Sequence, residues 1–566
     1  MKVKLPDALK GFHFRRLHGF AINNFDAEML LPALFYVIAT DGRGLGKRLT
    51  EISPGEYTRK LAQHRRIVGL EGAQRERVLD KWVRTSLISV ARTGRSRKGG
   101  EQILYLKPLS FLTFKPGFPV QRTRLREVHE FLYRTLKWRA SGAGESAVSD
   151  MGRRVRQAFN QGVQLKTEQD GSGYDGQYDG RTSLDTEAML CLHYLDGFDK
   201  AYPSLHSVAE GEAPTCEAGG AILADDFLGF IRAYSASVPA SVLARYLVCL
   251  INFELLIYTL KLATAANELV RARLLPQEMR PLAQADVVPT AALKFYVDCT
   301  GVGTSTSSRL AQTAFWRHLE QFERFLEAVL TLKTLDSYSG AAPALHGPRR
   351  TKGEYLHALL SLTGNVKVEA ACYNRMIDIE AGNDDDAQVK EFIANLREDP
   401  SLSDLGRLVQ VLVEANRGEV LGNCAKWIRD VGGISRGDGL LSGRTRGQRR
   451  NWRYFLSDSL LETLVQLHFA IGAGGPSGGA ADTRSTTISD FLQQLEDRYG
   501  ILIAAPPESS DSAETRIAAR ENLIALRARL RQMGLFADLS DDFNSQQLRP
   551  RYPVEPMTAL VRRDAR

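Results

Sequence analysis

Residues 73–109 read AQRERVLDKWVRTSLISVARTGRSRKGGEQILYLKPL, and this stretch predicts a helix followed by a two-stranded hairpin. The aliphatic runs at 87–91 and 103–106 favour strands, and the glycines between them favour a loop. The connection between the two runs is strongly basic. Its cationic residues are Arg92, Arg95, Arg97 and Lys98. We therefore expect a hairpin whose tip can meet a polyanion.

The predicted helix before the hairpin has two unlike faces, because successive side chains in a helix are turned by about 100°. One side is apolar and carries Val78, Leu79, Trp82 and Val83. The opposite side is cationic and carries Arg77, Lys81 and Arg84. A cationic helix followed by a hairpin with a cationic tip is the pattern of a winged helix-turn-helix. In that arrangement the helix enters a DNA groove and the wing touches phosphate.

Charge is distributed unevenly along the 566 residues, whose formal net charge is +8. Residues 59–100 hold twelve Lys or Arg against three Asp or Glu. Residues 169–231 hold twelve acidic residues against two basic ones. The first segment predicts a basic surface for a polyanion at one end of the chain. The second suits either a basic partner or a solvated acidic surface.

Composition points to a chain with sizeable cores, since 43% of the residues are hydrophobic and 25% are charged. The six cysteines are scattered without metal-ligand spacing, which favours a reducing compartment. The N-terminus lacks the apolar core of a secretory signal. The most apolar run, 246–266, is interrupted by polar residues and predicts a buried core helix. We expect a cytoplasmic protein without membrane contact or cofactor.

The predicted fold is mainly α, in three domains. Residues 1–139 form the winged-helix-like domain with its small hairpin wing, and a small-residue linker follows it. Residues 148–430 predict a large helical middle with an acidic loop at 168–186. Residues 431–566 hold a basic loop and a C-terminal helical module. Its three helices and terminal strand pair are compatible with a second winged helix.

The basic loop, 432–453, provides a second set of candidate phosphate contacts. They are Arg444, Arg446, Arg449, Arg450 and Arg453, with Arg436 before them. Trp452 and Tyr454 are interleaved with these arginines, which is the composition of a single-strand stacking site. The alternative is a surface loop whose two aromatic side chains pack into the helix that follows.

Other motifs are better explained by structure than by chemistry. Residues 299–308, CTGVGTSTSS, precede a predicted helix but lack the Gly-Lys-Ser/Thr of a phosphate-binding loop, so helix capping is favoured. Asp384, Asp385 and Asp386 begin a predicted helix, where acids offset the helix dipole. The glycine- and aspartate-rich stretch 175–185 lacks the ligands of a calcium loop. We find no metal or nucleophile motif and expect no enzyme.

Three segments together resemble helix-rich accessory proteins of bacterial anti-phage defence systems of the methylation-associated type. They are MLLPALFYVIATDGR at 29–43, WVRTSLISVARTGR at 82–95 and ENLIALRARLRQMGLFADLSDDFNSQQLRPRY at 521–552. The resemblance implies a subunit without ATPase activity that helps recognise or restrict foreign DNA. Its expected partners are duplex DNA and other subunits such as an ATPase. The alternatives are a protein-docking scaffold without DNA contact and a divergent nuclease.

Overall fold

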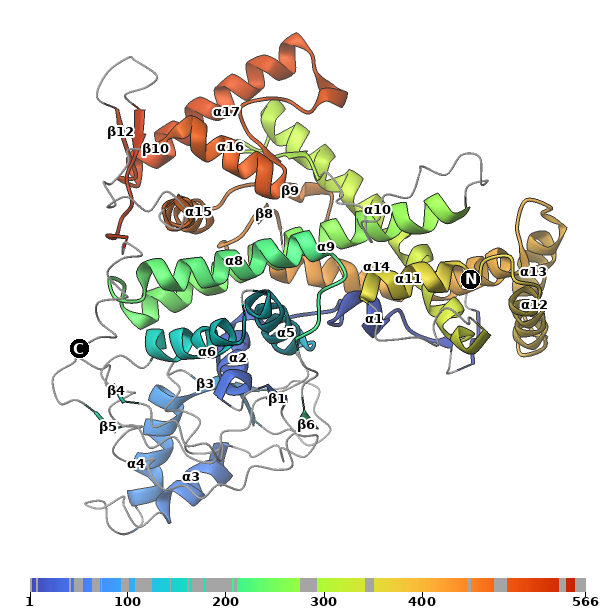
Figure 1. Cartoon of the computed structure of the whole chain (residues 1–566), viewed down its shortest axis with the longest axis horizontal. Helices are drawn as coiled ribbons and strands as arrows, with labels where there is room; N and C mark the ends of the chain where they lie inside the picture. Colours follow the sequence, from blue (N-terminus) through green and yellow to red (C-terminus); the bar gives the residue numbers. More distant parts are fainter. Residues whose placement is uncertain are drawn as a thin grey trace.

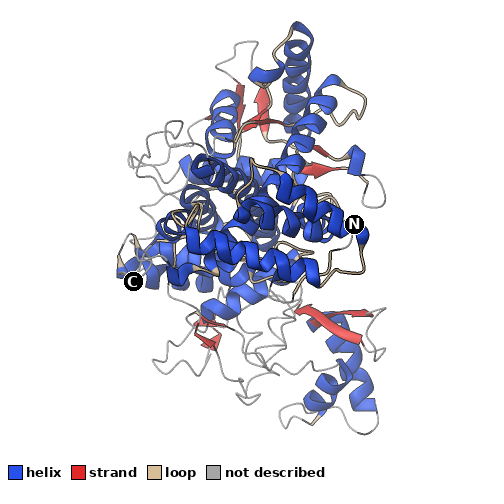
Figure 2. Cartoon of the chain, turned by 90° about the vertical axis from the view of Figure 1, so that its right-hand side faces the viewer, coloured by secondary structure: helices blue, strands red, loops and turns tan. Residues whose placement is uncertain are grey.

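The chain is mainly helical, as predicted, with short strands beside and between the helices (Figures 1 and 2). The computed structural model describes residues 3–6, 9–39, 42–44, 54–63, 72, 74–92, 101–106, 125–142, 144–159, 163–164, 177–178, 206–207, 211–274, 293–341, 351–444, 449–472, 486–538 and 546–554. One continuous hydrophobic core runs from Val3 to Leu548 through all three predicted domains. The division into three domains stays a prediction.

Long helices form the centre of the molecule. They are α8 (Glu217–Tyr234), α9 (Ala240–Leu274), α10 (Thr306–Asp336), α14 (Asp404–Val431) and α15 (Asp458–Gly472). Helix α9 packs on α8, α10, α14 and α15. It is apolar on nearly every side, and a helix that is apolar all round must be buried.

Helix α9 is long and apolar enough to cross a membrane over Ala240–Arg271, but 67% of its apolar window is buried inside the fold. The predicted core role of 246–266 is therefore confirmed. Its buried Glu254 lies beside Asp226 of α8, which accepts a hydrogen bond from Tyr499 at 2.5 Å and pairs with Arg498. Burial, and then the charge of Asp226, raise the pKa of Glu254, so a neutral carboxyl suits this site.

The N-terminal segment lies against the centre. Its elements are α1 (Arg15–His18), η2 (Ala27–Met29), α2 (Leu30–Ala39), α5 (Val128–Ser141) and α6 (Glu145–Phe159). The side chain of Asp26 caps η2 by accepting a hydrogen bond from the Glu28 backbone N–H. Helix α2 packs on α5 and α6.

The predicted helix and hairpin of residues 73–109 are present. They comprise α4 (Gln74–Trp82), a π-helical turn (Val83–Leu87), β2 (Ile88–Arg92) and β3 (Glu101–Leu106), with α3 (Pro54–Ala62) packed on α4. Strands β2 and β3 are antiparallel, with Ile88 opposite Leu106 and Arg92 opposite Glu101. The short strand before α3, β1 (Arg43–Gly44), pairs with β6 (His206–Ser207). A complete N-terminal winged helix therefore remains a prediction.

The C-terminal module begins with α15. It continues through β10 (Thr486–Thr487), α16 (Ile488–Tyr499), α17 (Ala513–Gln532), β12 (Phe536–Asp538) and β13 (Gln546–Leu548). Strand β13 lies between β10 and β12, antiparallel to both. After α16, β11 (Ile501–Leu502) pairs in parallel with β7 (Phe295–Tyr296). Gly500 makes this turn with φ +73°, where a Cβ would collide with the main-chain oxygen of Leu293.

Helices α12 (Val366–Ala381) and α13 (Ala387–Glu398) lie at one edge of the molecule in Figure 1, and α11 (Lys352–Leu360) packs on α10. Helix α12 packs on α14. Asp386 caps α13 by accepting from two backbone N–H groups, and the acidic run lies at the start of this helix as predicted. The remaining short elements are β4 (Val163–Gln164), β5 (Gln177–Tyr178), η6 (Ser339–Ala341), β8 (Leu441–Ser442), η8 (Arg449–Asn451), β9 (Arg453–Tyr454) and η9 (Glu508–Ser510).

Candidate nucleic-acid interface

Helix α4 turns a cationic face outward. Arg77 and Lys81, one turn apart, are both exposed, while Leu79 and Val83 on the opposite side are buried. Val78 is 43% exposed, so its predicted place on the packed face is wrong. The reason is that the packed stripe is narrow and centred between Leu79 and Val83, about 120° of rotation away from Val78. An apolar side chain thus lies in solvent beside two cations.

A chain of polar contacts links α3, α4 and the hairpin. Thr58 of α3 donates to Asp80 of α4 at 3.1 Å. Arg84 then donates to Asp80 at 2.7 Å and to Glu101 of β3 at 2.6 Å. These contacts join α3 to α4 and α4 to β3, so together they fix the direction in which the hairpin leaves the helix.

Arg84 therefore has a different surrounding from Arg77 and Lys81. The hydrogen bond to Glu101, together with Asp80, raises the pKa of Arg84 despite its partial burial. Two carboxylates share this guanidinium, so little of its charge remains for a phosphate. We expect Arg84 to position the hairpin.

The remaining predicted contacts of this unit belong to the end of β2 and to the sequence between β2 and β3. Arg92 ends β2 opposite Glu101, and its side chain lies outside the described residues. Arg95, Arg97 and Lys98 also lie outside them. The described strands place the two ends of this connection side by side, directly after the cationic helix.

The second basic segment exposes some of its arginines. Arg444, Arg449 and Arg450 are exposed, Arg446 lies outside the described residues, and Arg436 pairs with Asp438 at 2.9 Å. The proposed stacking role of the two aromatic residues is wrong, because both side chains are buried. Tyr454 contacts His318 at 2.6 Å, and Trp452 donates to the main-chain oxygen of Arg444 at 3.0 Å.

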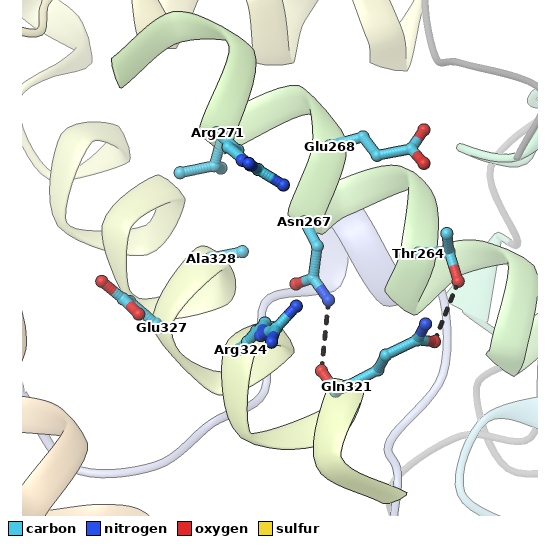
Figure 3. A pocket seen from close by; sticks show the side chains of 9 residues that line it. Thr264, Asn267, Glu268, Arg271, Gln321, Arg324, Glu327 and Ala328 are labelled. Carbon is cyan, nitrogen blue, oxygen red and sulfur yellow. Dashed lines mark hydrogen bonds between the residues drawn. The ribbon is translucent and has the colours of Figure 1, made fainter. Parts of the chain in front are cut away.

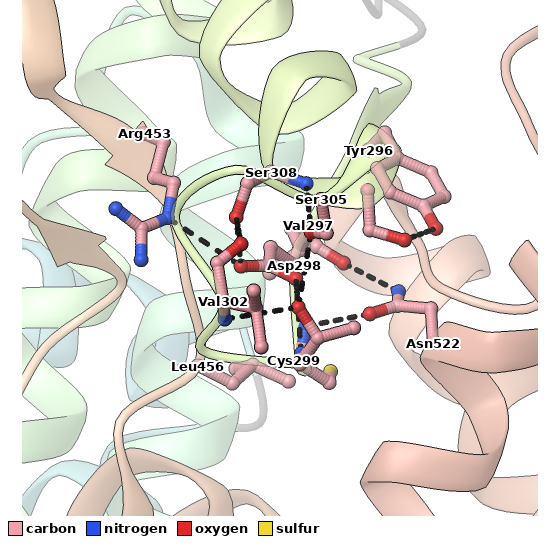
Figure 4. Close-up of polar contacts among 12 residues, drawn as sticks. Tyr296, Val297, Asp298, Cys299, Val302, Ser305, Ser308, Arg453, Leu456 and Asn522 are labelled. Carbon is pink, nitrogen blue, oxygen red and sulfur yellow. Dashed lines mark hydrogen bonds and ion pairs between the residues drawn. The ribbon is translucent and has the colours of Figure 1, made fainter. Parts of the chain in front are cut away.

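Arg453 joins a buried network around Asp298 (Figure 4). Asp298 is completely buried and accepts from Arg453 Nε at 3.4 Å. Its carboxylate also accepts hydrogen bonds from the Thr300 N–H and hydroxyl at 2.9 and 2.8 Å and from the Ser308 hydroxyl at 2.7 Å. Ser305 caps α10 by accepting from the Ser308 N–H, as predicted for this motif. Polar groups of this motif therefore bind the chain's own buried carboxylate.

Sequence reasoning did not identify Asn522, which anchors α17. Its side chain is fully buried, accepts from the Cys299 N–H at 2.7 Å and donates to the carbonyls of Val297 and Ile503 at 2.9 and 3.1 Å (Figure 4). An asparagine among leucines and alanines in mid-helix was the available signal, since a buried amide needs partners.

The two basic elements do not form one local site. Figures 1 and 2 share their vertical axis, and in both the α3–α4 unit lies at one end of the molecule while α17 and its neighbours lie at the other. In Figure 1, β8 and β9 lie on the α17 side of the central helices. A straight DNA duplex bound at the α3–α4 unit would therefore not reach the basic segment around β8 and β9.

A groove of about 400 Å³ lies between α9 and α10 (Figure 3). Its polar lining is Thr264, Asn267, Glu268, Arg271, Gln321, Arg324 and Glu327. Thr264 donates to the Gln321 side chain at 3.3 Å, and Asn267 donates to the Gln321 carbonyl at 3.1 Å. Two carboxylates offset two guanidinium groups, so the groove has no bias towards a polyanion.

His18, His318 and Cys299 are buried in the core. Burial lowers the pKa of His18 to about 3 and that of His318 to about 4, so both are neutral near pH 7. Burial also raises the pKa of Cys299 to about 12, which disfavours a thiolate. Within the described segments, no group of three or more His, Cys, Asp or Glu is placed to hold a metal ion.

Comparison with known proteins gives one match. Residues 7–552 match the family described as "Methylation-associated defense system protein MAD7". No curated protein and no solved structure matches the chain. The match covers nearly the whole sequence, including the helix–hairpin unit, the helical centre and the C-terminal module.

Proposed function

The chain belongs to the family of methylation-associated defense system protein MAD7, and from this premise we propose that it is a DNA-binding accessory subunit of its defence system. It acts on duplex DNA through the N-terminal unit of α4, β2 and β3. Other subunits, such as an ATPase, supply the chemistry in the cytoplasm. The chain itself contributes recognition.

One observation carries the proposal: α4 is a helix with an outward cationic face, followed at once by a hairpin whose connection is basic. Arg77 and Lys81 are exposed on that face. The contacts from Thr58 through Asp80 and Arg84 to Glu101 hold helix and hairpin as one unit. A pre-organised pair of contacts loses less entropy on binding than two flexible ones.

In this proposal α4 enters the major groove, which is wide enough for one helix. Arg77 and Lys81 contact phosphates or base edges, and the exposed Val78 contacts thymine methyl groups. The hairpin tip, with Arg92, Arg95, Arg97 and Lys98, contacts backbone phosphate. Arg444, Arg449 and Arg450 are exposed and lie in sequence between β8 and β9, two strands on the other side of the central helices in Figure 1, so they would meet a separate stretch of DNA.

A second function, protein docking, is favoured by the C-terminal module. The order α15, β10, α16, α17, β12, β13, with β13 between the other strands, is the order of a winged helix, and we propose that fold for it. Its hairpin connection, 539–545, carries Asp541 and Asp542 and no basic residue. Such a wing repels phosphate, so the same arrangement suits a protein partner.

The DNA proposal is tested by replacing Arg92, Arg95, Arg97 and Lys98 with alanine in the full chain. Binding to a fluorescent duplex is measured by anisotropy across a salt series. We expect weaker binding and a slope of log K against log salt that is shallower by about 0.9 for each phosphate that the variant no longer neutralises. An unchanged affinity in the folded variant would contradict the proposal.

A parallel assay separates the nuclease alternative. Purified chain is incubated with duplex DNA and Mg²⁺ or Mn²⁺, and the products are run on a denaturing gel. The accessory role predicts retained but intact DNA. Metal-dependent cleavage that persists in the quadruple-alanine variant would favour an enzyme over an accessory subunit.

A further inference from the structure

Large hydrophobic side chains are exposed mainly on two helices. Among the described residues, seven large hydrophobic side chains are exposed, and five of them lie on α12 or α17. Single exposed apolar residues are ordinary, but rows of them on one helix face mark a contact surface. Both helix faces are therefore candidates for contact with another molecule.

Helix α12 presents an apolar row to solvent. Val366, Ala370, Tyr373 and Ile377 are all exposed, Val366 to 81%. Their spacing of four, three and four residues places them within one narrow stripe of the helix. The opposite side, with Val368, Cys372 and Met376, is buried against the core. The stripe therefore lies opposite the packed side, where it can meet another molecule.

Helix α17 presents a similar row. Ala513, Ile517, Ile524 and Ala528 are exposed, Ile524 to 64%, and they lie on one face of the helix. Its inner side is held by Asn522, Leu526 and Leu530, which are buried. The two isoleucines are seven residues apart, the same interval that separates Val366 from Tyr373 on α12.

The charges around the two rows are opposite. Residues 366–404, which contain α12 and α13, hold ten acidic and four basic residues. Residues 513–532, which form α17, hold five basic and two acidic residues. Arg520 is exposed on the flank of the Ile517 and Ile524 row, and Arg516 beside it is exposed and pairs with Asp511 at 2.6 Å. Opposite charges beside matching apolar rows favour one pairing and disfavour the pairing of like with like.

We propose that copies of this chain associate head to tail, with α17 of one copy packed on α12 of the next. The two isoleucines of α17 meet the Val366, Tyr373 and Ile377 row, and the arginine flank meets the acidic lobe. Because the two faces differ, the contact is heterologous and leaves one free face of each kind at the ends. It can therefore extend into an open chain of copies, which would align several DNA-binding units.

Duplex DNA is a weaker candidate for the α17 face. Its neighbouring hairpin connection carries Asp541 and Asp542, and Asp538 ends β12. These acids would lie beside phosphate if α17 entered a groove. Two exposed isoleucines also present more apolar surface than a helix needs to contact thymine methyl groups in a DNA groove. Such a surface suits the centre of a protein–protein contact.

The test uses two variants of the full chain, each with one face broken. Ile524→Asp places a charge in the α17 row, and Tyr373→Asp places one in the α12 row. Sedimentation velocity is recorded over a concentration series. We expect the unaltered chain to sediment faster as concentration rises, and each variant alone to remain monomeric, with association weakened about thirtyfold or more.

The decisive sample is an equimolar mixture of the two variants. Each retains the face that the other lacks, so we expect a dimer and no larger species. The matched control is Val302→Asp. Val302 is an exposed hydrophobic residue that lies outside both α12 and α17, so this variant should associate like the unaltered chain. Association of Tyr373→Asp alone, a mixture that stays monomeric, or an unaltered chain that is monomeric at every concentration would each overturn the proposal.

Discussion

The chain contains two units in which a helix is followed directly by an antiparallel hairpin, and their surfaces differ. In the N-terminal unit, α4 exposes Arg77 and Lys81, and the connection at 93–100 is basic. In the C-terminal unit, α17 exposes Ile517 and Ile524, and the connection at 539–545 is acidic. The same order of elements thus supports two kinds of contact. Charge and exposed apolar surface, more than topology, indicate the partner.

The two units also differ in how they are anchored. Buried Asn522 and the adjacent Asp298 network fix the C-terminal unit to the rest of the molecule. Partly exposed Asp80, Arg84 and Glu101 hold the N-terminal unit together. Buried polar networks contribute more to stability when intact and cost more when broken than surface pairs do. Variants of the two anchors should therefore differ in effect.

The largest effect is expected from Asp298→Ala. This change leaves Arg453, Ser308 and Thr300 without their shared carboxylate, and breaking a buried pair in this way costs about 3–5 kcal/mol. The measurement is urea unfolding followed by circular dichroism. The control is Asp438→Ala. Asp438 pairs with Arg436 and is more exposed than Asp298, so its loss should lower the free energy of unfolding by at most about 1 kcal/mol. Equal unfolding midpoints for the two variants would contradict a larger contribution from the buried Asp298 than from the more exposed Asp438.

Acid should destabilise both halves of the molecule through buried histidines. His18 lies in the N-terminal core and His318 beside Tyr454, and their pKa values in the fold are about 3 and about 4. The unfolded chain takes up these protons near pH 6.5, so stability falls as pH drops below that value. Each histidine contributes a loss of up to about 1.4 kcal/mol per pH unit.

The loss from His318 should end near pH 4 and that from His18 near pH 3. Unfolding curves recorded between pH 7 and pH 4 test this, with His318→Gln as the comparison, since glutamine removes the titration. The variant should show a shallower dependence on pH. A dependence identical to that of the unaltered chain would show that His318 is not held neutral.

A smaller effect is expected from Arg84→Ala. Its two ion pairs are about one third exposed, so solvent screening limits their contribution to about 1 kcal/mol. Because Arg84 joins α4 to β3, the loss should be local. Hydrogen exchange should quicken in the β2 and β3 amides and stay unchanged in α17. Arg77→Ala is the matched control, and faster exchange in that variant too would exclude a specific bracing role for Arg84.

Sequence reasoning recovered what depends on local periodicity and composition. The helix at α4, its hairpin, the core role of α9, the capping role of the 299–308 motif and the acidic start of α13 all follow from such patterns. These features are decided within a few residues of one another. The mainly helical fold and the family resemblance were also predictable, because both depend on short stretches of sequence.

Features that depend on distant residues were not recovered. Arg453 looked like a free cation, but it pairs with Asp298, which is far away in sequence. Tyr454 looked like a stacking residue, but it packs on His318 of α10. The strand pairing of β10 with β13 crosses two helices and could not be read from either strand alone. A run of arginines therefore indicates charge in the sequence, but not charge on the surface.

The most direct test compares the two helix faces in one DNA-binding experiment. Arg77→Ala with Lys81→Ala alters α4, and Arg516→Ala with Arg520→Ala removes the same number of charges from α17. Anisotropy with one duplex is measured across a salt series. We predict that the α4 pair weakens binding and reduces the slope of log K against log salt by about 1.8, while the α17 pair changes neither. Equal losses for both pairs, or a loss confined to the α17 pair, would contradict the assignment of DNA binding to the N-terminal unit.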